Sequence, residues 1–275
     1  MLAEGKEWEC HLRGKHKIKN VNFLPGDKVL ISIEETGMGL VEGVLPRKNQ
    51  LIRPTIANVD QLVIIASLAK SVTDLVLVDR LLVIAEAEQI QPLLVLNKAD
   101  LLEERQYQEI VKLYQQYYQV VVTSTKMNIG IDNLRDCLAD KISVFAGPSG
   151  VGKSSLLNKV QKDLKLKSAE VSKKTGRGRH TTRHVSLLPL ESGGMVADTP
   201  GFSRLELPKV APEEMGTLFP EFAKLIGNCK FRNCFHDKEP HCAVKEAVEE
   251  GKISSERYKR YLQFLEELKN KELKY

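Results

Sequence analysis

The chain of 275 residues is 42% hydrophobic and 28% charged, with a formal net charge of +5 and five cysteines. This length allows two or three domains, and this composition is typical of a globular protein rather than a disordered one. Residues 1–20 are polar and basic, and the chain has no apolar run of about eighteen residues. We therefore expect neither a signal peptide nor a membrane span, and we expect a cytoplasmic protein.

Residues 1–54 have the pattern of a small β-barrel. Strands are expected at 7–12, 28–33 and 40–45, because short apolar runs alternate there with turns that contain glycine. A barrel with a basic face is typical of a protein that binds nucleic acid, and a charged loop in solvent is the alternative interpretation. The basic residues in question are Arg13, Lys15, His16, Lys17 and Lys19.

Residues 55–208 change to alternating strands and helices, which predicts a parallel sheet with helices on its faces. In such open sheets, ligands bind at the carboxyl ends of the strands. The polar segments that follow the strands are therefore the candidate site. Strands are expected at 62–66, 93–96, 120–123 and 142–146, helices at 73–91 and 103–117, and a hairpin at 184–190 and 195–197.

A glycine-rich segment from Gly147 to Ser154 follows the strand at 142–146 and precedes a helical pattern. This is the context of a phosphate-binding P-loop, whose glycines let successive backbone N–H groups point at an anion beside a helix N-terminus. Lys153 would reach the β- and γ-phosphates, and the Ser154 hydroxyl would bind Mg²⁺. A glycine-rich turn before an ordinary helix is the alternative. The candidate nucleotide-binding residues are Gly147, Pro148, Ser149, Gly150, Val151, Gly152, Lys153, Ser154 and Ser155.

The strand at 93–96 ends in an N-K-x-D tetrapeptide, residues 97–100. The Asp100 carboxylate can accept hydrogen bonds from both guanine N1–H and the 2-amino group, whereas adenine has no such pair of donors. Asp100 therefore favours GTP over ATP. Asn97 and Lys98 would hold the loop and cover the base, and Ser124 would contact the guanine oxygen. The polar stop after the next strand adds the nucleotide-binding candidates Ser124, Thr125 and Lys126.

Asp198 and Gly201 form a D-x-x-G motif at the end of the predicted hairpin. Asp198 would hold Mg²⁺ through water, and the Gly201 N–H would sense the γ-phosphate. A charged turn at a strand end is the alternative for Asp198. Phe202 follows, where Ras-like proteins have a glutamine that orients the attacking water. A phenyl ring cannot hydrogen-bond water, so we expect slow intrinsic hydrolysis.

The most basic segment of the chain, residues 162–183, contains the residue expected to orient that water. His180 lies there beside Thr181 and Thr182, and these three residues together with Lys153 are the catalytic candidates. Contact with RNA phosphate is the alternative role of His180, since arginines surround it. The sequence leaves open which of the two threonines would bind Mg²⁺.

Residues 209–275 predict a helical domain that holds one structural zinc ion. Cys229, Cys234, His236 and Cys242 supply three thiolates and one imidazole, which is a complete set for a closed tetrahedral site. Chance clustering of reduced cysteines is the alternative, and His241 is a less favoured ligand. An apolar stripe predicts a C-terminal helix that begins near residue 254 and packs on its own domain.

The base-reading motif precedes the P-loop in this chain, whereas a standard GTPase has the P-loop first. We therefore expect a circularly permuted GTPase domain. In its motifs and their order the chain resembles the ribosome small-subunit-dependent GTPase A family, permuted GTPases of bacterial ribosome assembly. The resemblance is carried by segments 58–60, 79–80, 97–100, 147–154, 178–183 and 198–202 and by the cysteine cluster.

The resemblance implies a multidomain chain with an N-terminal OB-fold, a central α/β P-loop GTPase domain and a C-terminal zinc domain. It also implies binding to the small (30S) ribosomal subunit and its 16S rRNA, and GTP hydrolysis, with Mg²⁺, that the subunit stimulates during late maturation. We expect a monomer that binds GTP and GDP and no membrane. The alternative is an RNA-binding assembly factor with nucleotide as a conformational ligand and little turnover. An ATP-dependent kinase is a third reading, which Asp100 disfavours.

Overall fold

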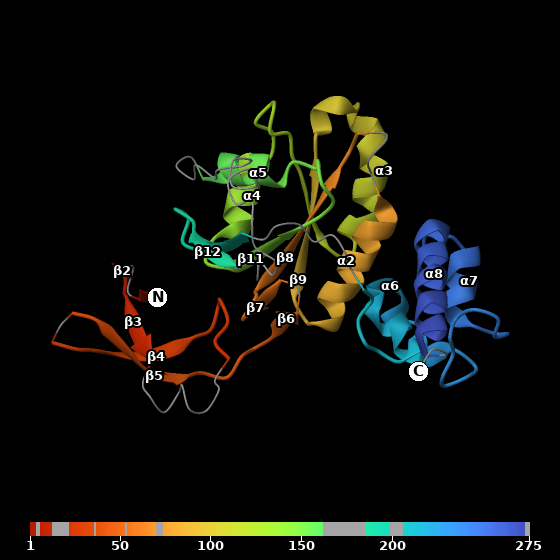
Figure 1. Ribbon diagram of the computed structural model, residues 1–275. Coiled ribbons are helices and arrows are strands. Elements are labelled where there is room, and N and C mark those ends of the chain that lie inside the picture. The colour runs from red at the N-terminus through yellow and green to blue at the C-terminus, as the bar shows by residue number, and fades with distance from the viewer. Residues whose placement is uncertain are drawn as a thin grey trace, which may run out of the picture.

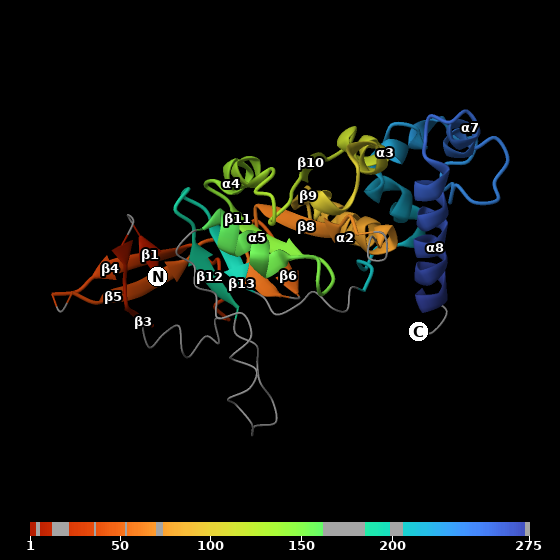
Figure 2. The same ribbon diagram turned by 90° about the horizontal axis from the view of Figure 1, so that it is seen from above.

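The computed structural model describes residues 1–3, 6–12, 22–35, 37–52, 54–69, 74–161, 185–198 and 206–272. A small N-terminal sheet, a central α/β region and a helical C-terminal region follow one another along the molecule (Figures 1 and 2). None of the helices in these residues is both long enough and apolar enough to cross a membrane.

The described part of the central region contains a six-stranded sheet in the order β10-β9-β8-β11-β13-β12. All neighbouring strands pair in parallel except β12, which runs antiparallel to β13 at the edge. Every residue of β8 is buried, as expected for a strand covered on both faces. The bounds are Gln61–Ser67 (β8), Gln91–Asn97 (β9), Gln119–Val122 (β10), Ile142–Ala146 (β11), Ser186–Pro189 (β12) and Met195–Asp198 (β13).

Helices cover both faces of this sheet (Figure 1). Alternate residues of a strand point to opposite faces, so Leu62 and Ile64 of β8 pack in one apolar cluster and Val63 and Ile65 in another. The first cluster includes α2 (Leu75–Ala87) and α3 (Glu104–Gln115), and the second includes α4 (Ile131–Leu138) and α5 (Lys153–Val160). The sheet expected from the sequence is therefore confirmed.

Helix α2 is shorter than the 73–91 helix that the sequence predicts. It begins after Asp74, whose carboxylate accepts a hydrogen bond from Leu77 N at 3.0 Å. It ends because Gln89 adopts a positive φ of 52° and the Ile90 N–H turns back to the carbonyl oxygen of Ala85 at 2.8 Å. Strand β9 therefore begins at Gln91, before Pro92, whereas the sequence predicts that the strand begins after Pro92.

The N-terminal region contains a two-stranded hairpin and a three-stranded sheet within the described residues. The hairpin joins β1 (Leu2–Ala3) to β2 (Lys6–Glu7), and the sheet has the order β3-β5-β4. A closed OB-like barrel stays a prediction, and the basic residues between Arg13 and Lys19 lie outside the described residues. The sheet strands are β3 (Cys10–Leu12), β4 (Val29–Ile33) and β5 (Gly39–Val44).

A hairpin of β6 (Gln50–Ile52) and β7 (Thr55–Ala57) connects this region to the central sheet. The domain boundary suggested by the sequence, at residue 54, falls in its turn. Leu51 and Ile56 on its two strands are buried in the first apolar cluster of the central region. The hairpin therefore packs with the central region on both sides of that boundary.

The C-terminal region packs aromatic side chains against helix α8 (Ser255–Glu272). Tyr261 lies with its ring centroid 4.9 Å from that of Phe222, and the same apolar cluster contains Val83 of α2. The predicted apolar stripe of α8 packs within this cluster, which confirms its inward orientation. The other elements are η2 (Pro212–Leu218), α6 (Pro220–Ala223), η3 (Ile226–Asn228) and α7 (Ala243–Glu249).

A buried group of charges also joins this region to α2. Asp79 is fully buried and accepts hydrogen bonds from Tyr114 Oη at 2.9 Å and from Arg257 Nη1 at 2.6 Å. Arg260 Nε donates to the second oxygen of Asp79, and Arg257 also forms a two-point pair with Glu221 of α6. The two positive and two negative charges balance, so each buried charge has a partner of opposite sign. We call these four residues the ionic cluster: Asp79, Glu221, Arg257 and Arg260.

Candidate nucleotide site and metal centre

The candidate nucleotide-binding segments meet at one edge of the central sheet. Strands β8, β9, β10, β11 and β13 run parallel, so their carboxyl ends lie on the same side. There β9 ends in Asn97, β11 leads into Gly147, and β13 ends in Asp198, whereas Ser124 follows shortly after β10. This edge is where open α/β sheets bind ligands.

The backbone of the P-loop depends on its glycines. Gly147, Gly150 and Gly152 have φ angles of 142°, 83° and 102°, which side chains rarely allow. A Cβ atom on Gly147 would lie 2.3 Å from the carbonyl oxygen of Ile65, and one on Gly152 would lie 2.4 Å from Asn97 Nδ2. The loop opens onto the N-terminus of α5, where Ser154 and Ser155 are exposed. This conformation can direct backbone N–H groups at a phosphate.

Lys153 folds back over the same loop. Its ammonium donates hydrogen bonds to the carbonyl oxygens of Gly147 and Pro148, each at 2.8 Å. Burial lowers the pKa of Lys153, because the charged form loses hydration. These contacts hold a positive charge at the rim of the loop, where a bound phosphate would attract it.

Two side chains tie the base-reading loop to the P-loop. Asn97 is fully buried and donates from Nδ2 to the carbonyl oxygen of Val151 at 2.8 Å. Lys98, held at a positive φ of 67°, donates from Nζ to the carbonyl oxygen of Gly150 at 2.7 Å. The base-reading and phosphate-binding segments therefore form one connected structure, although 52 to 54 residues separate the partners in sequence.

Thr123 is a residue that sequence reasoning missed. Its hydroxyl donates to Asn97 Oδ1 at 3.1 Å, and both side chains are fully buried. This bond fixes which way the Asn97 amide points, so that Nδ2 faces Val151. The available signal was a polar residue directly after the apolar strand β10 and before Ser124.

Asp100 is oriented by the loop that follows β10. Ser124 Oγ donates to Asp100 Oδ1 at 2.5 Å and accepts a hydrogen bond from Met127 N at 3.1 Å. The turn closes through Gly130, where a Cβ atom would lie 2.1 Å from the carbonyl oxygen of Val122. Ser124 thus holds one carboxylate oxygen of Asp100 in a fixed position. Of the neighbouring candidates, Thr125 is half-buried and Lys126 is exposed.

Several predicted site residues lie outside the described residues. These are the catalytic candidates His180, Thr181 and Thr182 and the motif residues Gly201 and Phe202. For Asp198 the structure describes the backbone at the end of β13, where it pairs with Ser186, and not the side chain. The roles of these residues in hydrolysis stay predictions.

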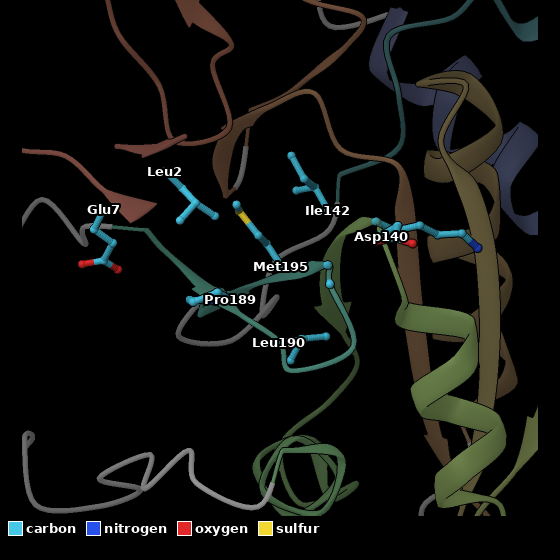
Figure 3. Close-up of a pocket in the computed structure, with 10 residues that line it drawn as sticks. Leu2, Glu7, Asp140, Ile142, Pro189, Leu190 and Met195 are labelled. Atoms are coloured by element: carbon cyan, nitrogen blue, oxygen red, sulfur yellow. The ribbon is translucent and has the colours of Figure 1, made fainter. Parts of the chain in front are cut away.

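A pocket of about 530 Å³ opens at a different place, between the β1–β2 hairpin and the turn that joins β12 to β13 (Figure 3). Ile142 and Met195, the first residues of β11 and β13, line it together with Leu2 and Glu7 of the hairpin. It therefore lies at the amino ends of the strands, opposite the edge with the nucleotide candidates. None of the predicted site residues lines this pocket.

The four predicted zinc ligands converge in the C-terminal region. Their ligand atoms all lie within 4.8 Å of one another. His236 Nδ1 is 3.5 Å from Cys229 Sγ and 3.3 Å from Cys242 Sγ, and the two sulfurs are 3.9 Å apart. A tetrahedral zinc ion with Zn–S near 2.3 Å and Zn–N near 2.0 Å gives separations of roughly 3.5–3.8 Å. The donor set of Cys229, Cys234, His236 and Cys242 therefore fits zinc.

Neighbouring groups fix the ligand loop. The Glu239 carboxylate accepts hydrogen bonds from Phe235 N at 2.9 Å and Asp237 N at 3.0 Å. Burial acts to raise the pKa of Glu239, but these backbone donors outweigh it and hold the pKa below its usual value. Tyr258 Oη donates to the carbonyl oxygen of His236 at 2.7 Å. Gly216 leaves room for the imidazole, since a Cβ atom there would lie 3.0 Å from His236 Cδ2.

Known proteins match this chain along nearly its whole length. The family model described as RsgA GTPase matches residues 44–208. The small ribosomal subunit biogenesis GTPase RsgA of Moorella thermoacetica is 48% identical over 97% of this chain and 92% of its own. The protein of the same name from a Geobacillus species is 45% identical over 100% and 95%.

Solved structures agree with the sequence relatives. YjeQ from Thermotoga maritima superposes with a TM-score of 0.83 at 40% identity, covering 96% of this chain and 91% of that one. YloQ, described as a circularly permuted GTPase, has a TM-score of 0.79 at 38% identity and covers 97% and 88%. The predicted permutation is thereby confirmed, with β9 and its base-reading loop preceding β11 and the P-loop in the chain. This chain belongs to the RsgA GTPase family.

Proposed function

We propose that this protein is a GTPase that acts in biogenesis of the small ribosomal subunit. One observation carries the choice of nucleotide. Ser124 holds the Asp100 carboxylate at 2.5 Å, while Asn97 and Lys98 of the same base-reading motif bind the P-loop backbone. A guanine recognised by Asp100 and a phosphate chain in the P-loop would then occupy one continuous site. The names of the curated relatives support the ribosomal role.

Within that site each residue has a proposed task. Asp100 accepts hydrogen bonds from the guanine edge, the P-loop N–H groups bind the phosphates, and Lys153 moves from its carbonyl partners to the β- and γ-phosphates. Mg²⁺, which neutralises charge on these phosphates, would be held by Ser154 and, through water, by Asp198. Hydroxyl and carboxylate oxygens suit this hard cation. His180 is proposed to orient the attacking water, and Gly201 to contact the γ-phosphate.

We further propose the division of labour among the regions. Residues 1–54 bind 16S rRNA as an OB-like barrel, residues 55–208 form the GTPase domain, and residues 209–275 hold one structural zinc ion. The protein acts as a cytoplasmic monomer. Zinc is structural because the four ligands close the tetrahedron and leave no position for substrate.

The decisive experiment compares GTP hydrolysis with and without purified 30S subunits. We expect slow hydrolysis by the protein alone and a large stimulation by the subunit. Binding to the subunit without stimulation would instead support the alternative, an RNA-binding assembly factor with nucleotide as a conformational ligand.

His180→Ala should abolish most of the stimulated turnover and leave GTP affinity nearly unchanged. Wild-type turnover in that variant would exclude its catalytic role.

Nucleotide choice has its own test. Asp100→Asn should weaken GTP binding and favour xanthosine triphosphate, because an asparagine amide can pair with the 2-oxo group that replaces the 2-amino group of guanine. Asp132→Asn, an exposed carboxylate on α4, is the matched control and should change neither affinity. Tighter binding of ATP than of GTP by the wild-type protein would contradict the proposed site.

A further inference from the structure

The loop between the first two zinc ligands presents an aromatic ring to solvent. Between Cys229 and Cys234 the chain runs Lys230, Phe231, Arg232 and Asn233, and all four residues are exposed. Phe231 is 44% exposed, and no other phenylalanine, tyrosine or tryptophan in the described part of the chain is exposed to this extent. The ring is thus an exception to how this protein uses its aromatic residues.

Phe235, four residues further along the chain, is an example of an aromatic residue in this region that has a packing role. It packs against the apolar cluster of the C-terminal region, and the ammonium of Lys269 lies 4.2 Å from its ring centroid. Phe231 does not belong to that cluster. Its ring has a basic neighbour, Lys230, whose Nζ lies 5.9 Å from the ring centroid. The fold therefore gives no packing role to Phe231.

The loop is held firmly although its side chains are exposed. The ligands Cys229 and Cys234 anchor its two ends, and the Lys230 N–H donates to the carbonyl oxygen of His241 at 3.2 Å. A short loop closed in this way has little backbone freedom to lose when it binds a partner. The entropy cost of ordering a loop, which weakens binding by flexible loops, is therefore small for this one.

The charge around the loop between Cys229 and Cys234 indicates which class of partner it binds. Lys230, Arg232 and Lys238 are exposed cations. The acidic residues nearest in sequence are engaged elsewhere, since Glu239 accepts from the Phe235 and Asp237 N–H groups and Asp237 faces Lys269 at 3.9 Å. A single exposed ring between cations differs from the broad apolar patches that mark protein interfaces. It matches proteins that bind single-stranded nucleic acid, which stack bases on aromatic rings and contact phosphates with lysine and arginine.

We propose that Phe231 stacks on an unpaired nucleobase of RNA while Lys230 and Arg232 contact the adjoining phosphates. The proposal rests on the proposed ribosomal function for the identity of that RNA. A phenyl ring offers no hydrogen bond, so the contact recognises an unstacked base without selecting which base it is. Helix α7, close to this loop in the chain, lies at the end of the molecule remote from the N-terminal sheet (Figures 1 and 2), so the RNA would be contacted far from that sheet.

The test measures RNA affinity with the zinc-loaded, full-length protein. Phe231→Ala should bind a mixed-sequence single-stranded RNA of about twelve nucleotides and purified 30S subunits about tenfold more weakly, the usual size of one base stack. Phe231→Leu, which keeps apolar bulk without a ring face, should lose as much, and Phe231→Tyr should restore affinity. Val76→Ala is the matched control, because Val76 is an apolar side chain that is 38% exposed and lies on α2, outside the regions proposed to bind RNA.

A fluorescent reporter distinguishes stacking from simple proximity. The chain has one tryptophan, so Trp8→Phe combined with Phe231→Trp places a single indole at the loop. Its emission should be quenched by the single-stranded RNA and by 30S subunits alike. Quenching by the subunits alone would assign the ring to a ribosomal protein and overturn the proposal, as would wild-type affinity in Phe231→Leu. Failure of wild-type GTPase stimulation by the subunit would instead overturn the proposed function.

Discussion

The two regions that flank the GTPase domain are attached to it in opposite ways. The C-terminal region shares an apolar cluster with Val83 of α2 and is joined to that helix by the buried ionic cluster. The N-terminal sheet is joined by hydrogen bonds around Asn58, whose side chain donates to the carbonyl oxygen of Gly26 at 2.8 Å and accepts from Lys48 N at 2.8 Å. We call these bonds the polar collar.

This difference predicts two kinds of mechanical behaviour. Separating the C-terminal region from α2 would break the buried ion pairs and the apolar contacts at the same time. Removing only one charged partner would leave the other charge buried without compensation. Neutral hydrogen bonds such as those of the polar collar contribute only about 1 kcal/mol each. We therefore expect the C-terminal region to move together with the GTPase domain as one body. We expect the N-terminal sheet to change its position relative to the GTPase domain.

Loss of zinc should have the largest effect. Structural zinc sites contribute on the order of 10 kcal/mol to the folded state of small domains. Cys234→Ser should abolish zinc binding and unfold the C-terminal region, and thermal melting of the GTPase domain should also shift because Val83 loses its partners. Metal analysis and calorimetry measure both effects. The control is Cys137→Ser, a half-buried cysteine outside the ligand set. Full zinc content in Cys234→Ser would contradict the assigned ligand.

The ionic cluster should be next. Asp79→Ala leaves Arg260 and one side of Arg257 without their carboxylate, at a cost of about 3–5 kcal/mol in the free energy of unfolding. Urea denaturation measures this change. The matched control is Asp132→Ala, which removes an exposed partner of Arg135 on α4 and should cost less than about 1 kcal/mol. Equal effects of the two substitutions would mean that the ionic cluster does not stabilise the attachment of the C-terminal region.

Breaking the polar collar should have a smaller and more local effect. Asn58→Ala removes the bonds to Gly26 and Lys48, and we expect a loss of about 1–3 kcal/mol that is confined to the N-terminal sheet. Hydrogen exchange should accelerate in β4 and β5 while α2 and α8 keep their protection. Asn133→Ala, on the exposed face of α4, is the control. Faster exchange throughout the molecule would show that the collar is part of one cooperative unit.

The smallest effect concerns pH. Asp27 accepts hydrogen bonds from Arg47 Nε at 2.7 Å and from Leu24 N at 2.8 Å. Burial acts to raise the pKa of Asp27, but these bonds outweigh it and lower the pKa below the usual value near 3.8. The stabilisation is therefore complete above that value and is lost as pH falls through the lower folded pKa. After correction for the intrinsic slowing of amide exchange at low pH, the protection factors of β4 should fall below pH about 3.8, and those of Asp27→Asn should not.

Sequence patterns predicted the central sheet because β8, β9 and β11 are almost entirely buried and therefore read as nearly unbroken apolar runs. They also predicted the zinc ligands and the P-loop, whose chemistry fixes residue type and spacing. Asp79 could not be interpreted in this way, since its partner Arg257 lies 178 residues away and only the folded chain brings them together. The same holds for Thr123, whose role exists only because β9 and β10 are neighbours.

The predicted end of helix α2 was the other weak point. The end of α2 depends on the positive φ of Gln89, a conformation that the sequence does not demand of glutamine. The domain boundary expected at residue 54 stays a prediction. It lies in the turn of the β6–β7 hairpin, where a proline marks a turn equally well between domains or within a hairpin.

The ionic cluster also limits how the C-terminal region can move. Strand β13 lies in the central sheet, and Leu207 is buried in the apolar cluster that includes Val83 of α2. Both elements thus pack with the body that contains α2. We therefore expect the C-terminal region to keep its position relative to α2 when the nucleotide changes, so that nucleotide state would alter the surface between these elements rather than rotate the C-terminal region away.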